Sequence, residues 1–308
     1  MAGENAVCKE IINGYHLTAP WTTSGSAQWT YAEKDGQEWF LKRFLAPKYK
    51  RTEDGIPQNL VDRANARCEV FRNAQEMLYQ RVRSSDTGNI VSVSDFFRFG
   101  TSFYAASPRI PRSEVSAEEI SRLPEEKRIL LMKILTHSIQ NLHANRVVHA
   151  DLKPSNIILK RTASGGYTLK LIDFDASFLE EAPRSGEDIA FDPVYVAPET
   201  IQAMSDSTVR LTAKIDVFAL GLIFHLYYCG CHPVLPDGCP HAVHAIANGD
   251  PVELSEKLPQ WLKTLIGQMI QLDPEQRPSA AVVFQWLQEQ KQPSEHKSAG
   301  GFHKPPAL

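Results

Sequence analysis

A short polar stretch between two apolar runs holds residues that could transfer a phosphoryl group. The sequence from Val147 to Leu159 reads VVHADLKPSNIIL and brings Asp151, Lys153 and Asn156 close together along the chain. The apolar residues on both sides predict two strands that flank a loop, and a loop on a rigid base is a common place for reactive side chains. Phosphoryl transfer needs an acceptor for a hydroxyl proton, a cation beside the phosphate and an oxygen ligand for Mg²⁺. These three residue types supply those needs.

This stretch resembles the catalytic loop of the protein kinase superfamily, His-x-Asp-Leu-Lys-Pro-x-Asn. The resemblance implies ATP and Mg²⁺ as cofactors. It implies that Asp151 orients the attacking hydroxyl and accepts its proton, and that Lys153 offsets charge on the phosphoryl group. Asn156 is then expected to hold Mg²⁺ together with Asp173, because Asp173-Phe174-Asp175 looks like the family's Asp-Phe-Gly. The lysine and proline after Asp151 resemble the subclass that acts on serine and threonine.

The segment before the loop is predicted to be rich in strands. Aromatic runs at 29–31 and 39–41 surround Asp35-Gly36, a strong hairpin signal. By the same resemblance, Gly25 occupies the place of a glycine-rich loop over the phosphates, although two of the usual three glycines are missing. Lys42, in WFLKRF, looks like the lysine that holds the α- and β-phosphates. Ile110 is the expected backbone donor to adenine, since Pro108 has no N–H.

Residues 59–83 have the apolar spacing of a helix. In the resembling enzymes, a glutamate of this helix pairs with the phosphate-binding lysine. Glu76 is the preferred candidate, because Asn89-Ile90-Val91 follows at about the family's distance, and Glu69 is the alternative. A solvated glutamate on a helix face remains a competing interpretation of Glu76.

Three residues depart from the family's pattern. Asp175 replaces the glycine of Asp-Phe-Gly and adds a negative charge beside the expected metal. Asp192 stands where the resembling enzymes have threonine, and it could pair with Lys153. Ala150 replaces the arginine that often precedes the catalytic aspartate. We therefore expect activity that does not depend on a phosphate in the activation segment, 176–196.

Three motifs further along resemble the kinase C-lobe. They are Ala197-Pro198-Glu199, Asp216 in DVFALG, and Arg277 in DPEQRP. The resemblance implies that Asp216 supports the catalytic-loop backbone and that Arg277 pairs with Glu199. The expected fold is therefore α+β, a two-lobed protein kinase fold. Residues 1–110 would form a small β-rich N-lobe with one main helix, residues 111–290 a larger, mostly helical C-lobe, and residues 291–308 a disordered tail.

Composition limits the other possibilities. A formal net charge of -3 without long basic runs argues against nucleic-acid binding. Five cysteines and an N-terminus without the features of an export signal favour the cytoplasm. The longest apolar stretch, 217–231, is interrupted by His225 and is short for a bilayer, so no membrane partner is expected. Cysteines and histidines gather at 229–241, but the Cys-x-Cys spacing is unusual for zinc, and a helix end followed by a loop is preferred.

These observations favour a serine/threonine protein kinase whose partners are ATP and a protein substrate. LIDFDASF and DPVYVAPE resemble stand-alone bacterial kinases of the eukaryotic type. Two alternatives remain open at this stage. One is a nucleotide-binding pseudokinase scaffold, motivated by the eroded glycine loop, Asp175 and Asp192. The other is a small-molecule phosphotransferase of the aminoglycoside or choline type, which shares the loop and the IDFD element. No feature of the sequence indicates an oligomeric state.

Overall fold

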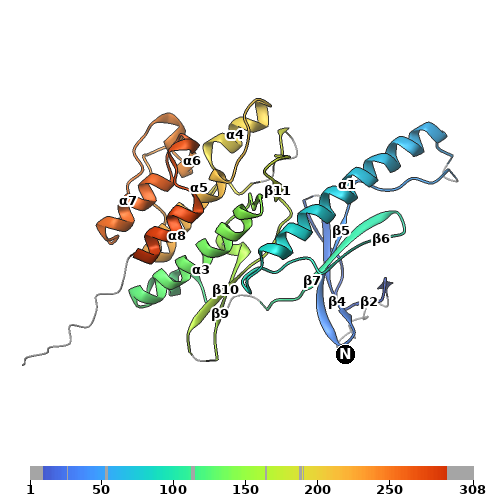
Figure 1. The fold of residues 1–308 in the computed structure, drawn as a ribbon, viewed down its shortest axis with the longest axis horizontal. Helices are drawn as coiled ribbons and strands as arrows, with labels where there is room; N and C mark the ends of the chain where they lie inside the picture. Colours follow the sequence, from blue (N-terminus) through green and yellow to red (C-terminus); the bar gives the residue numbers. More distant parts are fainter. Residues whose placement is uncertain are drawn as a thin grey trace, which may run out of the picture.

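The computed structural model describes residues 10–25, 27–52, 55–111, 115–163, 165–186, 189 and 191–289 (Figure 1). The tail expected at 291–308 lies outside the described residues. Strands dominate the first part of the chain and helices the second, so the α+β prediction is confirmed. The lobe boundaries at 110 and 290 stay predictions.

The N-terminal sheet has seven antiparallel strands in the order β1-β2-β4-β5-β7-β6, with β3 also paired to β4. Their bounds are β1 Ile11–Ile12, β2 Tyr15–Leu17, β3 Thr22–Ser24, β4 Ala27–Lys34, β5 Gln37–Phe44, β6 Asp95–Phe99 and β7 Ser102–Pro108. β4 and β5 form the predicted hairpin, in which Lys34 pairs with Gln37. Asp35 and Gly36 lie between them with φ of 54° and 73°. Two consecutive positive φ angles are what the favoured two-residue hairpin turn requires.

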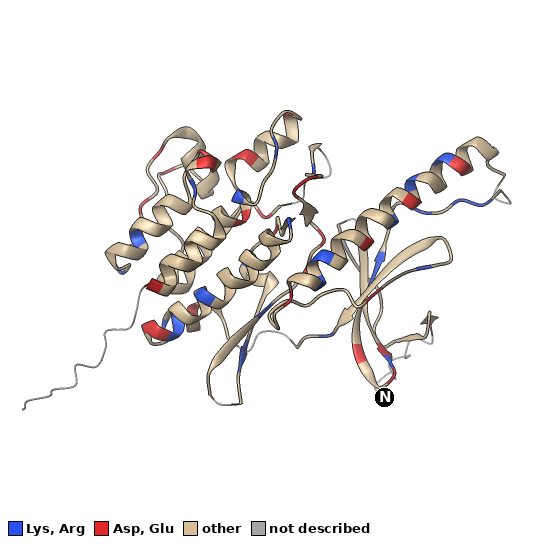
Figure 2. Ribbon diagram, in the orientation of Figure 1, with Lys and Arg blue, Asp and Glu red and all other residues tan. Residues whose placement is uncertain are grey.

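Helix α1, Gln58–Ser85, is the main helix of the sheet-containing part. Its Cys68 and Tyr79 are buried in one cluster with Phe44, Phe103 and Ala105 of the sheet. The N-terminal end of the helix extends beyond the strands (Figure 1). Acidic and basic residues are both distributed along α1 (Figure 2), and Arg72 forms an ion pair with Glu69.

The segment after α1 is joined to strand β10, Tyr167–Leu171, from far along the chain. The Leu171 N–H donates to the Asn89 carbonyl at 2.8 Å, and the Val91 N–H donates to the Leu171 carbonyl at 2.9 Å. The Asn89 side chain adds a bond to the Leu169 carbonyl at 2.8 Å. These bonds attach the C-terminal end of α1 to the part of the chain that carries the loop at 147–159.

The remaining elements form the mostly helical part. The helices are α2 Ala117–Ser121, α3 Glu125–Ala144, α4 Pro198–Ser205, α5 Lys214–Cys229, α6 Ala242–Asn248, α7 Gln260–Met269 and α8 Ala280–Glu289; the short elements are β8 Val147–Val148, η2 Pro154–Asn156, β9 Ile157–Arg161, β11 Phe178–Leu179 and η4 Pro274–Gln276. Helix α5 is buried along nearly its whole length. Gly221 allows α7 to approach, since a Cβ there would lie 2.8 Å from Ile270 Cγ2. Within the described residues, no helix combines the length and apolarity needed to cross a membrane.

Candidate active site

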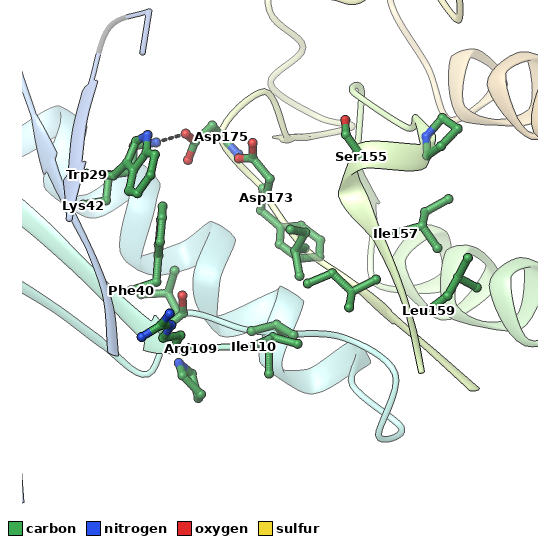
Figure 3. A pocket seen from close by; sticks show the side chains of 18 of the residues that line it. Trp29, Phe40, Lys42, Arg109, Ile110, Ser155, Ile157, Leu159, Asp173 and Asp175 are labelled. Atoms are coloured by element: carbon green, nitrogen blue, oxygen red, sulfur yellow. Dashed lines mark hydrogen bonds and ion pairs between the residues drawn. The ribbon is translucent and has the colours of Figure 1, made fainter. Parts of the chain in front are cut away.

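A cavity of about 680 Å³ lies between the sheet and the helical part. Strands β4 and β5 form one wall, residues 107–110 form one end, and β9 with Asp173 and Asp175 forms the opposite wall (Figure 3). Among the predicted site residues, Lys42, Ile110 and Asp173 line this cavity. Gly25 lies at the turn between β3 and β4 with φ of 55° and is not among the residues that line the cavity. The lining on this side begins with Ala27 and Trp29 of β4.

The loop at 149–156 brings Asp151, Lys153 and Asn156 into direct contact. The Lys153 ammonium lies 3.0 Å from Asp151 Oδ1 and 2.8 Å from Oδ2. The Asn156 amide donates to Asp151 Oδ2 at 3.0 Å and to the Asp151 carbonyl at 2.8 Å. The Asp151 carboxylate is therefore held from two sides at a fixed place on the loop.

A buried carboxylate supports this loop from below. Asp216, only 1% exposed, accepts bonds from the N–H groups of His149 and Ala150, each at 2.8 Å. His143 Nε2 lies 2.9 Å from the same carboxylate. Burial acts to raise the pKa of Asp216, but the bonds from His143 and the backbone outweigh it and keep the pKa below its ordinary value. Ala150 has φ of 66°, a left-handed conformation that these bonds hold in place.

Asp173 follows shortly after β10 and lies beside Asn156. The Ile172 N–H donates to the Asn156 carbonyl at 3.0 Å, which places the two segments next to each other. The His149 ring contacts Phe174, with ring centroids 5.0 Å apart. A carboxylate at 173 and an amide oxygen at 156 are ligands of the type that Mg²⁺ prefers. The residues present therefore fit the magnesium ion that the sequence predicts.

Lys42 pairs with Asp175, which corrects the expectation that a helix glutamate is its partner. The two side chains extend toward each other from opposite walls of the cavity (Figure 3). Glu76 is more than half exposed, and its carboxylate lies 4.0 Å from Arg72 Nε. Glu69 contacts Arg72 and the Tyr49 hydroxyl.

The phase of helix α1 explains this difference. Glu69 and Glu76 are seven residues apart and share one face with Arg72. The buried residues of α1 include Leu78, Tyr79 and Val82, and Tyr79 lines the cavity. Burial raises the pKa of the Tyr79 phenol, and the charges of Asp175 and Asp173 raise it further. The helix thus presents a phenol, not a carboxylate, to the cavity.

Three aromatic side chains of β4 and β5 form an aromatic wall of the cavity that the sequence did not lead us to predict. Trp29, Tyr31 and Phe40 all line the cavity. Tyr31 is the direct cross-strand partner of Phe40, and Trp29 is the partner of Lys42. The Trp29 and Phe40 rings stack with centroids 5.5 Å apart. The alternation of side chains along paired strands places these residues on one face, and that signal was present in the sequence.

Asp192 does not take up the pairing considered for it. Its carboxylate accepts the Val194 N–H at 3.0 Å, while the carboxylate that contacts Lys153 is that of Asp151. Ser177 of the activation segment is buried and donates to the His149 carbonyl at 3.0 Å. Arg184 donates to the Asp175 carbonyl at 2.5 Å and to the Ser177 carbonyl at 3.2 Å. The first part of the segment is therefore bonded to the loop.

The pair implied for Arg277 is confirmed. Arg277 and Glu199 are both buried, and they form two parallel bonds of 2.6 and 2.8 Å. Within 229–241, the His232 Nε2 lies 3.3 Å from the Tyr195 hydroxyl, and the Cys239 thiol lies 3.8 Å from Asp250 Oδ2. Among the described residues, no three His, Cys, Asp or Glu side chains are grouped so that they could share a metal ion.

Comparison with known proteins agrees with this geometry. Residues 61–287 match the family model described as "Protein kinase domain". The ovarian-specific serine/threonine-protein kinase Lok of Drosophila melanogaster is 26% identical over 80% of this chain and 50% of its own length. Calcium-dependent protein kinase 19 of Arabidopsis thaliana is 26% identical over 82% of this chain and 43% of its own length. Ribosomal protein S6 kinase alpha-3 of Homo sapiens is 24% identical over 78% and 32%. The chain thus spans half or less of the length of these relatives.

Proposed function

Because the chain belongs to the protein kinase domain family, we propose that it transfers the γ-phosphoryl group of ATP to serine or threonine hydroxyls of proteins, with Mg²⁺ as cofactor. The observation that carries this proposal is the Asp151 carboxylate, held by Lys153 and Asn156. Asp173, which lies beside Asn156, lines the cavity together with Lys42 (Figure 3). The relatives described as serine/threonine-protein kinases, together with the Lys153-Pro154 sequence, support the choice of hydroxyl.

In this mechanism, the substrate hydroxyl donates a hydrogen bond to Asp151. Its oxygen attacks the γ-phosphorus, the bond to the β–γ bridging oxygen breaks, and ADP leaves while Asp151 takes the proton. Lys153 lies within 3.0 Å of that carboxylate and offsets negative charge on the transferring group. Asn156 and Asp173 are the residues that would hold Mg²⁺, which offsets phosphate charge when bound.

Lys42 and the aromatic wall would serve the rest of the nucleotide. Lys42 extends into the cavity from β5 and can reach phosphate oxygens there. Trp29 and Phe40 offer ring faces to a planar base, and Ile110 lies at the end of the cavity formed by 107–110. We further propose that residues 1–110 and 111–290 act as the two lobes around this cavity, and that the protein works in the cytoplasm.

The proposal is tested by incubating the purified chain with Mg²⁺, γ-labelled ATP and casein as a generic protein acceptor. Label is expected on phosphoserine or phosphothreonine. Asp151→Asn should reduce the rate by about 10²- to 10⁴-fold, because it removes the proton acceptor but keeps the shape of the side chain. No transfer by the wild type, or equal transfer by Asp151→Asn, would refute the proposal.

One observation favours a second candidate, a nucleotide-binding scaffold without turnover. The lysine expected to hold phosphates is already paired with Asp175. Binding of Mg-ATP in a thermal-shift titration, combined with no transfer to casein, would select this candidate over the first.

A further inference from the structure

Lys42 is a buried cation and needs a fixed counter-ion. The residue is 7% exposed, and its side chain extends from the middle of the sheet. Its ammonium also lies 4.7 Å from the centroid of the Phe44 ring. An ammonium withdrawn from water is strongly disfavoured unless a carboxylate compensates its charge. The position of that carboxylate therefore decides where the ammonium points.

Helix α1 does not supply this carboxylate. Three acidic residues occur between Gln58 and Ser85, and each is engaged elsewhere. Asp62 accepts from the Gln58 side chain at 2.7 Å. Glu69 contacts Arg72 and Tyr49, and Glu76 is exposed beside Arg72.

Asp175 occupies a position suited to the task. Its carboxylate contacts Lys42 directly. Its backbone is fixed on both sides, since its N–H donates to Asp173 Oδ1 at 3.3 Å and its carbonyl accepts from Arg184 at 2.5 Å. The glycine that the resembling enzymes have at this place could not supply any of the charge.

We propose that Asp175 replaces the helix glutamate as the positioning residue that holds Lys42 toward the nucleotide phosphates. Asp175 acts through Lys42 and is not itself a catalytic residue. This inference rests on the proposed nucleotide-binding function of the cavity. It assigns to the segment after β10 a task that in the resembling enzymes belongs to the helix.

The first test needs neither nucleotide nor turnover. Lys42 is acylated with an N-hydroxysuccinimide ester at one fixed pH, and its labelling rate is followed by peptide mass spectrometry. Asp175→Asn should raise the rate up to about tenfold, because the amine is then no longer held in the ion pair with Asp175. Asp175→Glu, which keeps the charge, should restore slow labelling. Glu76→Gln tests the competing partner, and Asp62→Asn is the control for a surface carboxylate of the same helix; both should label as the wild type does.

The second test measures the dissociation constant for Mg-ATP by calorimetry. Asp175→Asn should raise it at least tenfold in the wild type and less than twofold in a Lys42→Met background, because the two side chains act as one unit. Equal effects in both backgrounds would overturn the proposal. So would unchanged labelling in Asp175→Asn, or faster labelling in Glu76→Gln. If the wild type does not bind Mg-ATP, the proposed function fails, while the labelling rates still decide the partner of Lys42.

Discussion

Arg277 and Glu199 join the connection between α7 and α8 to the first turn of α4. Their two bonds of 2.6 and 2.8 Å are arranged side by side. Arg277 also donates to three backbone carbonyls, those of Gln271, Lys214 and Leu272. The guanidinium is thus satisfied by one carboxylate and the ends of two helical segments, which makes the pair a structural tie behind the active site.

Removing the carboxylate should destabilise the fold strongly. Glu199→Ala leaves the buried guanidinium without a counter-ion, so we expect the free energy of unfolding to fall by about 3–5 kcal/mol. Urea denaturation measures this change. The exposed Glu275, two residues before Arg277, supplies the control, since Glu275→Ala should change the free energy by less than about 0.5 kcal/mol. A loss below about 1 kcal/mol in Glu199→Ala would contradict the structural role.

Activity should not require a phosphate on Ser185. Ala150 stands where an arginine would need such a phosphate, and Ser177 is already buried in a bond to the His149 carbonyl. Ser185→Ala is therefore expected to transfer phosphoryl groups at a rate within twofold of the wild type. Phosphatase-treated wild type provides the control. A tenfold loss of activity in either sample would show that the segment needs a phosphate.

Ser177 should contribute to stability instead. Ser177→Ala removes a bond from a buried hydroxyl to the loop, which typically contributes about 1 kcal/mol. Urea denaturation should show a loss of this size, with a smaller loss for the exposed Ser185→Ala. Equal stabilities of the two variants would argue against the bond at His149.

The fold should lose stability as the pH falls below about 6.5. His225 uses both ring nitrogens in its neutral form, with Nδ1 donating to the Cys231 carbonyl and Nε2 accepting the Ser255 N–H. Burial lowers the pKa of His225, and burial also lowers that of His232. The unfolded chain therefore binds more protons than the folded chain once the pH falls through the ordinary histidine pKa. Each such group can contribute up to about 1.4 kcal/mol per pH unit.

Urea denaturation at pH 7.5 and pH 5.5 checks this dependence. His225→Gln should be less stable at pH 7.5 but should lose less stability on acidification, because the group that resists protonation is gone. His244 is exposed, so His244→Gln should keep the pH dependence of the wild type. An unchanged slope in His225→Gln would mean that His225 does not couple folding to protons.

Trp29 should report nucleotide binding. Its ring lines the cavity and stacks on Phe40, so a base entering the cavity changes the surroundings of the indole. We expect Mg-ATP to change the tryptophan emission of the wild type and Trp29→Phe to lose most of that change. Trp286→Phe, in α8, should retain it. Retention of the full change by Trp29→Phe would place the bound base elsewhere.

The sequence predicted best what depends on short spacing. Asp151 and Asn156 are five residues apart, and the loop that joins them brings them into contact. The partner of Lys42 depends instead on how α1 is rotated and on where residue 175 lies relative to the sheet. The buried side of α1 includes Leu78 and Tyr79, which lie two and three residues after Glu76. Glu76 itself falls on the exposed side of the helix. Such a difference of phase is set by tertiary packing, which single-sequence periodicity does not resolve.

The aromatic wall could have been predicted. Trp29 and Tyr31 alternate along one strand, and Phe40 follows across a two-residue turn whose register the Asp35-Gly36 pair already indicated. The contact between Lys42 and Asp175 could not have been predicted in this way. It joins β5 to the segment after β10, and the distance between these two segments depends on how the whole chain folds.

The bonds between Asn89, Val91 and Leu171 fix the segment that follows helix α1 to strand β10. The C-terminal end of α1 is thereby attached to β10, while its N-terminal end extends past the sheet (Figure 1). Cys68 and Tyr79 hold the middle of the helix against the sheet. A molecule bound at the distant end of α1 would therefore contact the same element that reaches the cavity through Tyr79.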